Sequence, residues 1–579
     1  MMKKNSNGAG INVTKPLQHK LSSLSLMVLL ALFSFSYQAL AGACNPTSGI
    51  CSGDEVWDLS VSGAPGQTTT FKDDSVFNAN ASTLLIHKLI FTDRSILNAT
   101  VPIIGPIANF KFISNSVMNA LVGNAINEGW QYFSDAAVLN ASASNAITGG
   151  TQYIHNNAVL NALVSDAVAG GIQQFTNAAI LNALASKAIT GGAQIFLDNT
   201  VLNASISDAI SDGVQSFLND GILNASASNA IAGGTQTFWE NAQLNALHRE
   251  AIIGGTQNFI EAAILNASVG GAISGGTQIF NNYSQLKIGV DDAVAGSLVE
   301  LNDNSQLLMQ GHTAWVSSLA GNGGQVLGQG STDSTLTING THGEDTTFAG
   351  VLLNNGGTLN LVKDGTSRQT LTGVGSTVQN IDVLGGTLAF AQDGTFTTTG
   401  NYTTHTGATT AIGVDNATLT VGGTFTQQAG STLDITVGGA LDITADTAVL
   451  GGQLVINGFA DGPAPVKASV ATTTTYNLIH TAHGISGNFD NNPLAPTGLD
   501  YLLHDGHLSN NDHDYDMRFG LAWTDGLQRQ GTGSFTVNAG TAFDIDTALA
   551  DQIVPTGGFA SGWDGRSLTK AGDGLLVLS

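Results

Sequence analysis

The chain is poor in charge, in cysteine and in proline. Only 11% of its 579 residues are charged, and 18 basic against 43 acidic side chains leave a net charge of −25. So acidic a chain is unsuited to binding nucleic acid. Ten prolines beside a 42% hydrophobic content argue against disorder, because the apolar side chains can offset the entropy lost on folding. Glycine is abundant, with 72 residues, but it lacks the every-third spacing of collagen.

Long apolar runs are absent except near the N-terminus. Four lysines precede an apolar stretch from Leu21 to Phe35, and the small-residue pattern Ala39-Leu40-Ala41 follows it. This order is typical of a secretory signal peptide, so residues 1–41 are expected to be removed after Ala41. An uncleaved membrane anchor is the alternative, but serines interrupt the stretch and it is short for a span. After residue 41 no run reaches about 18 apolar residues, so no spanning helix is expected in the exported chain.

Only two cysteines, Cys44 and Cys51, are present, and both lie just past the expected cleavage site. Because exported proteins keep disulfides, we interpret residues 42–70 as an N-terminal cap with a small disulfide loop. Lipidation of Cys44 is the alternative, but Ala41 stands where lipoprotein signals place a large aliphatic residue. A zinc site needs about four ligands, and no further cysteine is available to complete one.

An internal repeat dominates the first half of the chain. A Leu-Asn-Ala triplet, once Met-Asn-Ala, returns every 21 residues without a slip. Its asparagines are Asn98, Asn119, Asn140, Asn161, Asn182, Asn203, Asn224, Asn245 and Asn266. A glutamine column from Gln131 to Gln278 keeps the same period, and each glutamine is followed two residues later by Phe or Ile. Fixed columns of this kind indicate identical units that stack on one another.

The period predicts an all-β fold, a right-handed parallel β-helix (solenoid) of about 21 residues per coil. Helical repeats need about 33 to 47 residues. Here the apolar spacing is two, so Gln152 and Ile154 share one face of a strand, and Gly149-Gly150 supplies a turn. We expect three short strands per coil, with Leu, Phe and Ile ladders inside. The repeated asparagines are expected at a corner, in a left-handed conformation, with amide hydrogen bonds from coil to coil.

The strict repeat predicts regular coils over residues 71–288, and the pattern loosens afterwards. Gly-Gly-Thr strand starts at Gly356, Gly385 and Gly422 predict an irregular β-helix over residues 289–525. The segment Gly462-Pro463-Ala464-Pro465 predicts a loop that decorates the rod rather than ends it. Residues 526–579 are expected to form the C-terminal coils.

These patterns resemble the passenger domains of type V autotransporters, especially AIDA-type adhesins with Gly-Gly-Thr-Gln repeats such as Gly150-Thr151-Gln152. The segment from Tyr476 to Trp523 is similar to a β-helical segment of such passengers. The C-terminal stretch is similar to the passenger-associated transport repeat, with Leu575 where Thr is usual. The residues that match this transport repeat are Leu568, Lys570, Gly572, Gly574, Leu576 and Leu578.

The resemblance covers nearly the whole exported chain and implies an outer-membrane or cell-surface location, reached through a C-terminal β-barrel. That barrel does not precede Ser579, so we expect a truncated passenger, one half of a split gene, or a fragment. With a barrel encoded downstream as its partner the chain would reach the surface. Without one it would stay in the periplasm.

Patterns that carry chemistry are weak. The sequence has no Gly-Asp-Ser-Gly or Gly-x-Ser-x-Gly segment, so no catalytic residue and no cofactor is predicted. The best metal candidate has Met517 where a calcium loop needs Gly and Trp523 where it needs Glu, so a solvated loop is expected and no metal site. The residues of that candidate are His504, His507, Asp512, His513, Asp514 and Asp516.

A polar stripe repeats along the regular coils. Its members are Asp135, Asn156, Asn177, Asp198, Asn219, Glu240 and Glu261. Carboxylates on neighbouring coils could serve a polysaccharide-processing enzyme. Asparagines interrupt them, however, and no Lys or Arg accompanies them, so a solvated face is the better interpretation.

We therefore predict an adhesin or self-association rod of the bacterial surface, with a role in aggregation, biofilm formation or virulence, rather than an enzyme. Its partners would be a host or neighbouring-cell surface or a second copy, with no nucleic acid. Many weak side-by-side contacts along a rod add up to strong attachment. A β-helical polysaccharide-processing enzyme and a non-functional truncated passenger are the alternatives.

Overall fold

The computed structural model describes residues 50–52, 56–58, 68–79, 88–102, 109–340, 345–413, 417–437, 442–459, 466–490, 499–523 and 530–579. The predicted signal peptide at 1–41, Cys44, most of the predicted cap at 42–70 and the proline-rich segment at 462–465 lie outside these residues. Of Cys51 the backbone alone is described, in the first strand.

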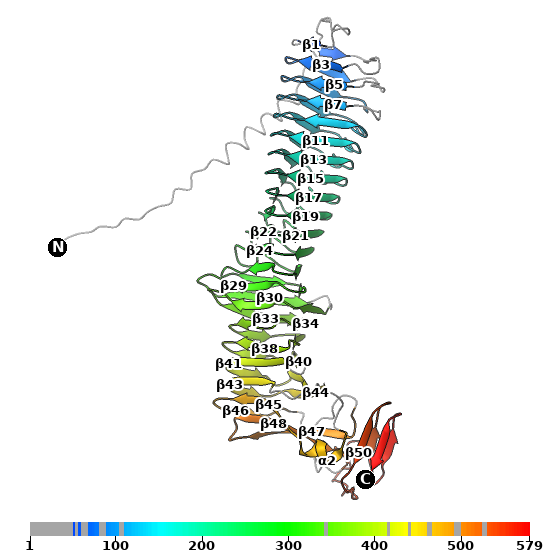
Figure 1. Cartoon of the computed structure of the whole chain (residues 1–579), viewed down its shortest axis with the longest axis vertical. Helices are drawn as coiled ribbons and strands as arrows, with labels where there is room; N and C mark the ends of the chain where they lie inside the picture. Colours follow the sequence, from blue (N-terminus) through cyan, green and yellow to red (C-terminus); the bar gives the residue numbers. More distant parts are fainter. Residues whose placement is uncertain are drawn as a thin grey trace, which may run out of the picture.

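Figure 1 shows one long β-solenoid. It is parallel and has about 17 turns with about 21 residues per coil. The predicted parallel β-helix is therefore confirmed. Each regular coil contributes one strand to each of two parallel sheets, called sheet A and sheet B here.

Sheet A has fourteen strands in sequence order, paired at a step of 21 residues through most of its length. They are β1 (Ile50–Ser52), β3 (Thr68–Lys72), β5 (Lys88–Phe91), β7 (Asn109–Phe112), β9 (Trp130–Phe133), β11 (Thr151–His155), β13 (Ile172–Thr176), β15 (Ala193–Leu197), β17 (Val214–Leu218), β19 (Thr235–Trp239), β21 (Thr256–Ile260), β23 (Thr277–Phe280), β25 (Leu298–Leu301) and β28 (Ser318–Ala320).

Sheet B carries the Leu-Asn-Ala triplets and continues into the less regular half. Its strands in the repeat are β2 (Val56–Asp58), β4 (Val76–Ala79), β6 (Ile96–Ala99), β8 (Val117–Ala120), β10 (Val138–Ala141), β12 (Val159–Ala162), β14 (Ile180–Ala183), β16 (Val201–Ala204), β18 (Ile222–Ala225), β20 (Gln243–Ala246), β22 (Ile264–Ala267), β24 (Gln285–Ile288) and β26 (Gln306–Leu308). The third strand expected in each coil is reduced to a single paired residue, as in the parallel bridge between Ile126 and Ile147.

Identical side chains stack inside the solenoid. The phenylalanine rings from Phe175 to Phe280 lie parallel, with centroids 4.5 to 4.9 Å apart from coil to coil. The leucine of each triplet and the isoleucine of each bridge are fully buried beside them. This spacing is close to the separation of neighbouring strands, so the backbone ladder sets the stacking distance of the core.

A buried glutamine ladder runs beside the phenylalanines. Each amide nitrogen donates to the side-chain oxygen one coil earlier, at 2.7 to 2.9 Å. The same nitrogen also donates to a backbone carbonyl three residues before it, at 3.2 Å in Gln236. The polar column inside the core is thus hydrogen-bonded along its length, which is the condition for burying polar groups at low cost.

The repeated asparagines do not lie at a corner. Asn140 is the third residue of β10 and faces outward between two buried residues. Positive φ angles occur instead in the turns, as at Asn156 (51°) after sheet A and Asn145 (54°) after sheet B. Simple alternation along the strand therefore holds. The glycine turn is as predicted: Gly150 has a φ of 73°, and a Cβ there would come within 2.9 Å of the Glu128 carbonyl oxygen.

The second half of the solenoid keeps the parallel pairing but loses the fixed step. Partners lie 19 residues apart at Arg368 and Thr387 but 26 apart at Gln325 and Val351. A six-stranded sheet replaces sheet A there, with β31 (Thr346–Phe348), β34 (Arg368–Leu371), β37 (Thr387–Phe390), β40 (Thr409–Ile412), β42 (Thr432–Val437) and β44 (Gln453–Phe459). Sheet B continues as β27 (Thr313–Val316), β29 (Gln325–Gly328), β30 (Ser334–Gly340), β32 (Val351–Asn354), β33 (Leu359–Gly365), β35 (Thr377–Val378), β36 (Ile381–Val383), β38 (Gly394–Thr398), β39 (Tyr402–Thr404), β41 (Ala417–Gln427), β43 (Ile443–Leu450), β45 (Thr475–Thr481), β46 (Ile485–Gly487), β47 (Leu502–Ser509) and β48 (Asp514–Leu521).

The prediction of β-helix coils as far as residue 525 is wrong at its end. β45 and β46 still pair in parallel with β43, but β47 and β48 form an antiparallel hairpin, and β48 pairs antiparallel with β45. Because β48 pairs with β45, the hairpin covers the edge of this last parallel strand, and no further coil is added.

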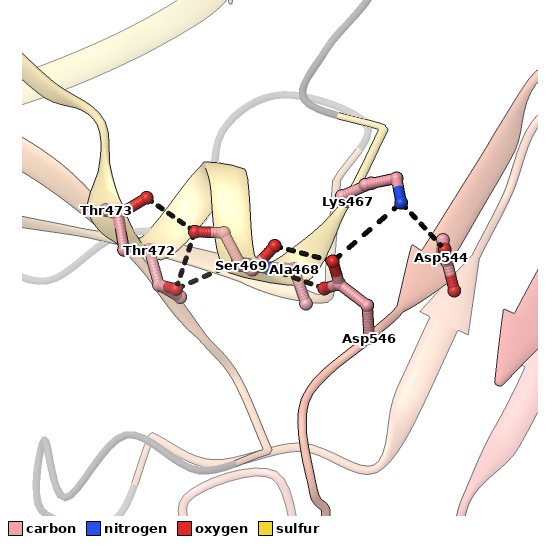
Figure 2. A network of polar contacts seen from close by, with 7 residues as sticks. All are labelled: Lys467, Ala468, Ser469, Thr472, Thr473, Asp544 and Asp546. Atoms are coloured by element: carbon pink, nitrogen blue, oxygen red, sulfur yellow. Dashed lines mark hydrogen bonds and ion pairs between the residues drawn. The ribbon is translucent and has the colours of Figure 1, made fainter. Parts of the chain in front are cut away.

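A small C-terminal module follows, with β49 (Ser534–Thr536), β50 (Ala542–Ile545), β51 (Thr569–Ala571) and β52 (Leu575–Leu578) in two parallel pairs. The short helix α2 (Ala468–Thr473) connects to it through the contacts in Figure 2. Asp546 accepts hydrogen bonds from the Ser469 backbone nitrogen and hydroxyl, and the Lys467 ammonium lies 3.5 Å from Asp544. A segment 77 residues earlier in the chain is thereby fixed to the module.

Candidate interaction face

The outward face of sheet A carries an apolar and aromatic surface, which we call the sheet A strip. It extends from β9 to β23 and has four strongly exposed members: Trp130 is 56% exposed, Val214 47%, Ile172 44% and Trp239 39%. The strip consists of Trp130, Tyr132, Tyr153, Ile172, Ile195, Leu197, Val214, Leu218, Trp239, Ile260 and Ile279. Polar, uncharged residues such as Gln174, Ser216 and Asn258 lie between these members. A surface that gathers exposed apolar and aromatic side chains typically marks an interaction site.

The strip follows from the strand period. Glutamine and phenylalanine point inward in each strand of sheet A, so the residues before, between and after them point outward. In-register pairing, as between Ile195 and Ser216, then aligns these outward residues in three rows along the rod. We call them the first, middle and last rows.

Aromatic rings stack at the N-terminal end of the strip. The rings of Tyr132 and Tyr153 are 4.6 Å apart and 13° from parallel, and His155 lies 6.1 Å from Tyr153. A nitrogen of the His155 ring contacts the Thr176 hydroxyl. Burial lowers the pKa of His155, which keeps the imidazole neutral near pH 7. The stack therefore carries no charge near pH 7.

Charge borders the strip at its two ends. The outward positions of β9 to β23 hold no Asp, Glu, Lys or Arg. Lys111 of β7 and Glu300 of β25 both stand in the middle row, one strand before and one strand after this uncharged stretch. The face is thus uncharged in the centre, positive at one end and negative at the other.

Sheet B presents a different outward face. Its asparagines form a ladder in which each amide nitrogen donates to the preceding asparagine oxygen at 2.7 to 3.0 Å. The coil-to-coil hydrogen bonds expected for these residues are present, on a strand rather than at a corner. Because the ladder satisfies its own amides, sheet B offers fewer free polar groups to a partner.

The polar stripe lies in the turn that follows sheet A and is solvent-exposed. Asn156 donates to Asp135 at 3.2 Å, and Asn219 donates to Asp198 at 2.5 Å. The stripe therefore forms one hydrophilic edge of the sheet A strip.

The residues of the metal candidate are dispersed over the terminal hairpin. His504 is buried in β47, where burial lowers its pKa to about 4, whereas His507 is exposed on the same strand. Asp514 pairs with His480 at 2.5 Å and Asp516 accepts from Asn477 at 2.9 Å. The expected solvated loop is wrong for these two acids, because both lie in β48. Among the described residues, no group of three or more His, Cys, Asp or Glu could hold a metal ion.

A shallow groove of about 430 Å³ crosses the outward face of sheet B in the irregular half. It is lined by Thr335, Asn360, Val362, Asn380, Ile381, Asp382, Asn401 and Thr403. Asp382 is the single carboxylate among them, and it lies 3.0 Å from a nitrogen of His405.

The transport-repeat residues lie in the C-terminal module. Lys570 is on β51 and its ammonium donates to the Gly572 carbonyl, while Leu576 and Leu578 belong to β52. Gly572 has a φ of 73° in the turn between the two strands. Leu568 and Gly574 flank them, and this cluster is remote in sequence from the sheet A strip.

Comparisons with protein-family models, with curated proteins and with solved structures find no match to this chain. Within the part of the chain that the structure describes, no helix has the length and apolar character needed to cross a membrane.

The sheet A strip was not predicted from the sequence, because it is made of the variable positions between the columns that repeat. Tyr153, between Gln152 and Ile154, is one such position. A test for charge at those positions would have found it, because the outward residues of eight successive strands are uncharged in an acidic chain.

Proposed function

We propose that the chain is an exported, adhesive rod that resembles an autotransporter passenger and that associates with itself through the sheet A strip. The strip is the observation that carries this proposal. An acidic chain repels itself in general, so an uncharged apolar surface that extends over eight strands favours contact at this face. Attachment to host or neighbouring cells, and export by a barrel, belong to the same proposal.

The size of the strip fits weak, repeated contacts. Eight strands at about 4.8 Å and about 16 Å of strand length give roughly 600 Å² on each copy. Two such surfaces bury about 1,200 Å², which is the low end for specific complexes. Single contacts would be transient, and many rods on one surface would bind firmly together.

A single exposed substitution tests the proposal. We expect Val214→Asp to weaken self-association of the purified chain at least tenfold, because it places a charge at the centre of the apolar strip. The measurement is sedimentation over a concentration series, followed by clumping of cells that display the chain.

Val201→Asp is the matched control, because Val201 is a half-buried outward residue on sheet B. It should leave association unchanged. Equal effects of the two substitutions, or none from either, would contradict a role for the sheet A strip.

A further inference from the structure

We propose that the sheet A strip binds a second copy of the chain in antiparallel orientation, about a twofold axis that passes between β15 and β17. This inference rests on the proposed function and specifies its register. The axis lies in the interface and is perpendicular to the rod. Each outward row then faces the same row of the second copy with its direction reversed, as in a self-complementary dimer.

The border charges select this orientation. Lys111 stands four strands of sheet A before β15, and Glu300 stands four strands after β17. The proposed axis therefore places Lys111 opposite Glu300 of the second copy, and it does so twice. A parallel pair would instead place lysine opposite lysine and glutamate opposite glutamate, which is repulsive.

The polar stripe selects the same register. About the proposed axis, each carboxylate of the stripe from the β9 coil to the β23 coil faces an asparagine of the second copy, and an amide can donate to a carboxylate. The facing pairs are Asp135 with Asn282, Asn156 with Glu261, Asn177 with Glu240, and Asp198 with Asn219.

A different register is worse. If the second copy is shifted by one coil along the rod, carboxylates face each other. A shift in one direction places Asp198 opposite Glu240 of the second copy, and a shift in the other direction places Asp198 opposite Asp198 of the second copy. On the opposite edge, Glu128 and Asp212 face glycines in the proposed register. Like charges in contact are the usual means by which an interface rejects a wrong alignment.

The centre of the interface is largely apolar. In the last row Leu197 of one copy faces Leu218 of the other, and in the middle row Ile195 faces Ser216. Sheets that pack face to face lie about 10 Å apart, which lets side chains of this size interdigitate. The apolar contacts at the centre of the interface thus stabilise the dimer, whereas the charges at its ends and along the polar stripe determine its register.

Charge reversal tests the register in the purified full chain. K111E and E300K should each weaken self-association about tenfold, because each turns two exposed attractive pairs into two repulsive ones. An equimolar mixture of the two variants should associate as tightly as the wild type, since both pairs in a mixed dimer are again of opposite charge. Sedimentation equilibrium measures the dissociation constants.

K88E is the matched control, because Lys88 is exposed on β5 and would face Ser318, which is neutral. Its dissociation constant should stay within twofold of the wild-type value. Far-UV circular dichroism and urea unfolding check that each variant is folded, because the Glu300 carboxylate is half-buried and accepts a hydrogen bond from Asn302 at 2.9 Å.

Two results separate the two proposals. If the wild type associates but mixing K111E with E300K fails to restore affinity, the antiparallel register is wrong and the adhesive function stands. If the wild type stays monomeric up to millimolar concentration, the proposed self-association and this register fail together.

Discussion

The two halves of the solenoid bury polar side chains in different ways. In the regular half, one residue type repeats inside each coil, and Gln194, Gln215 and Gln236 bind one another in line. In the irregular half, unlike residues form a closed network: Tyr402 and Thr404 both contact the Thr410 hydroxyl at 2.7 Å. In a repeat, each buried polar side chain finds its hydrogen-bond partner at the same position of the next coil. In an irregular coil, each buried polar side chain needs a different partner.

Lys363 shows how specific a partner in the irregular half must be. It occupies an inward position of β33 and is fully buried. Its ammonium donates to the backbone carbonyls of Asp364 and Gly385. Burial lowers the pKa of Lys363 to about 8, although the carboxylates of Asp364 and Asp345 oppose the shift. No equivalent of this lysine repeats on the neighbouring coils.

The largest effect is expected from breaking the glutamine ladder. Gln215→Leu keeps the volume but leaves the side-chain oxygen of Gln194 and the amide nitrogen of Gln236 without this partner. Unsatisfied buried amides cost about 1 to 3 kcal/mol each, so the free energy of unfolding should fall by about 3 kcal/mol. Urea unfolding, with hydrogen exchange to localise the loss, measures it.

Gln174→Leu is the control for the ladder, because Gln174 faces outward on β13 in the same sheet. It should change the free energy of unfolding by less than about 0.5 kcal/mol. A similar loss in both variants would show that the amide ladder adds nothing beyond ordinary packing.

A smaller effect, and one that depends on pH, is expected at Lys363. Because its folded-state pKa of about 8 lies below the ordinary 10.5, the unfolded chain binds more protons between these values. The free energy of unfolding should therefore rise, by about 1.5 kcal/mol between pH 8 and 9.5. Lys363→Met should remove this rise, and an equal rise in both proteins would exclude Lys363 as its source.

The smallest effect is expected on the outer asparagine ladder. Asn203 is half exposed, and water can replace its partners, so Asn203→Ala should cost about 0.5 kcal/mol. The same unfolding experiment measures it. If Asn203→Ala lowered the free energy of unfolding as much as Gln215→Leu does, burial would not explain the difference between the asparagine ladder and the glutamine ladder.

The fold was largely predictable because the repeat is visible in the sequence. A fixed period with alternate apolar residues leaves few architectures, and the stacked columns follow directly from it. The asparagines were placed at a corner because a repeated outward residue suggested a special backbone. Their side-chain hydrogen bonds explain the repetition without one.

The remaining features depend on contacts between segments that no period connects. The terminal hairpin of β47 and β48 breaks the parallel rule where the solenoid ends, and nothing in its local sequence indicates the change of direction. Asp544 and Asp546 hold α2 through Lys467 and Ser469, which lie about 77 residues earlier in the chain. The sheet A strip emerges only when the variable positions are seen side by side.

The identity of neighbouring coils has a genetic consequence. Tandem copies of one sequence invite unequal recombination, and the gain or loss of a whole repeat leaves every core column intact. Such a change would still shift the phase of acids and asparagines along the polar stripe. If rods associate through the sheet A strip as proposed, rods with different repeat numbers would meet out of register, so repeat number would determine which rods associate.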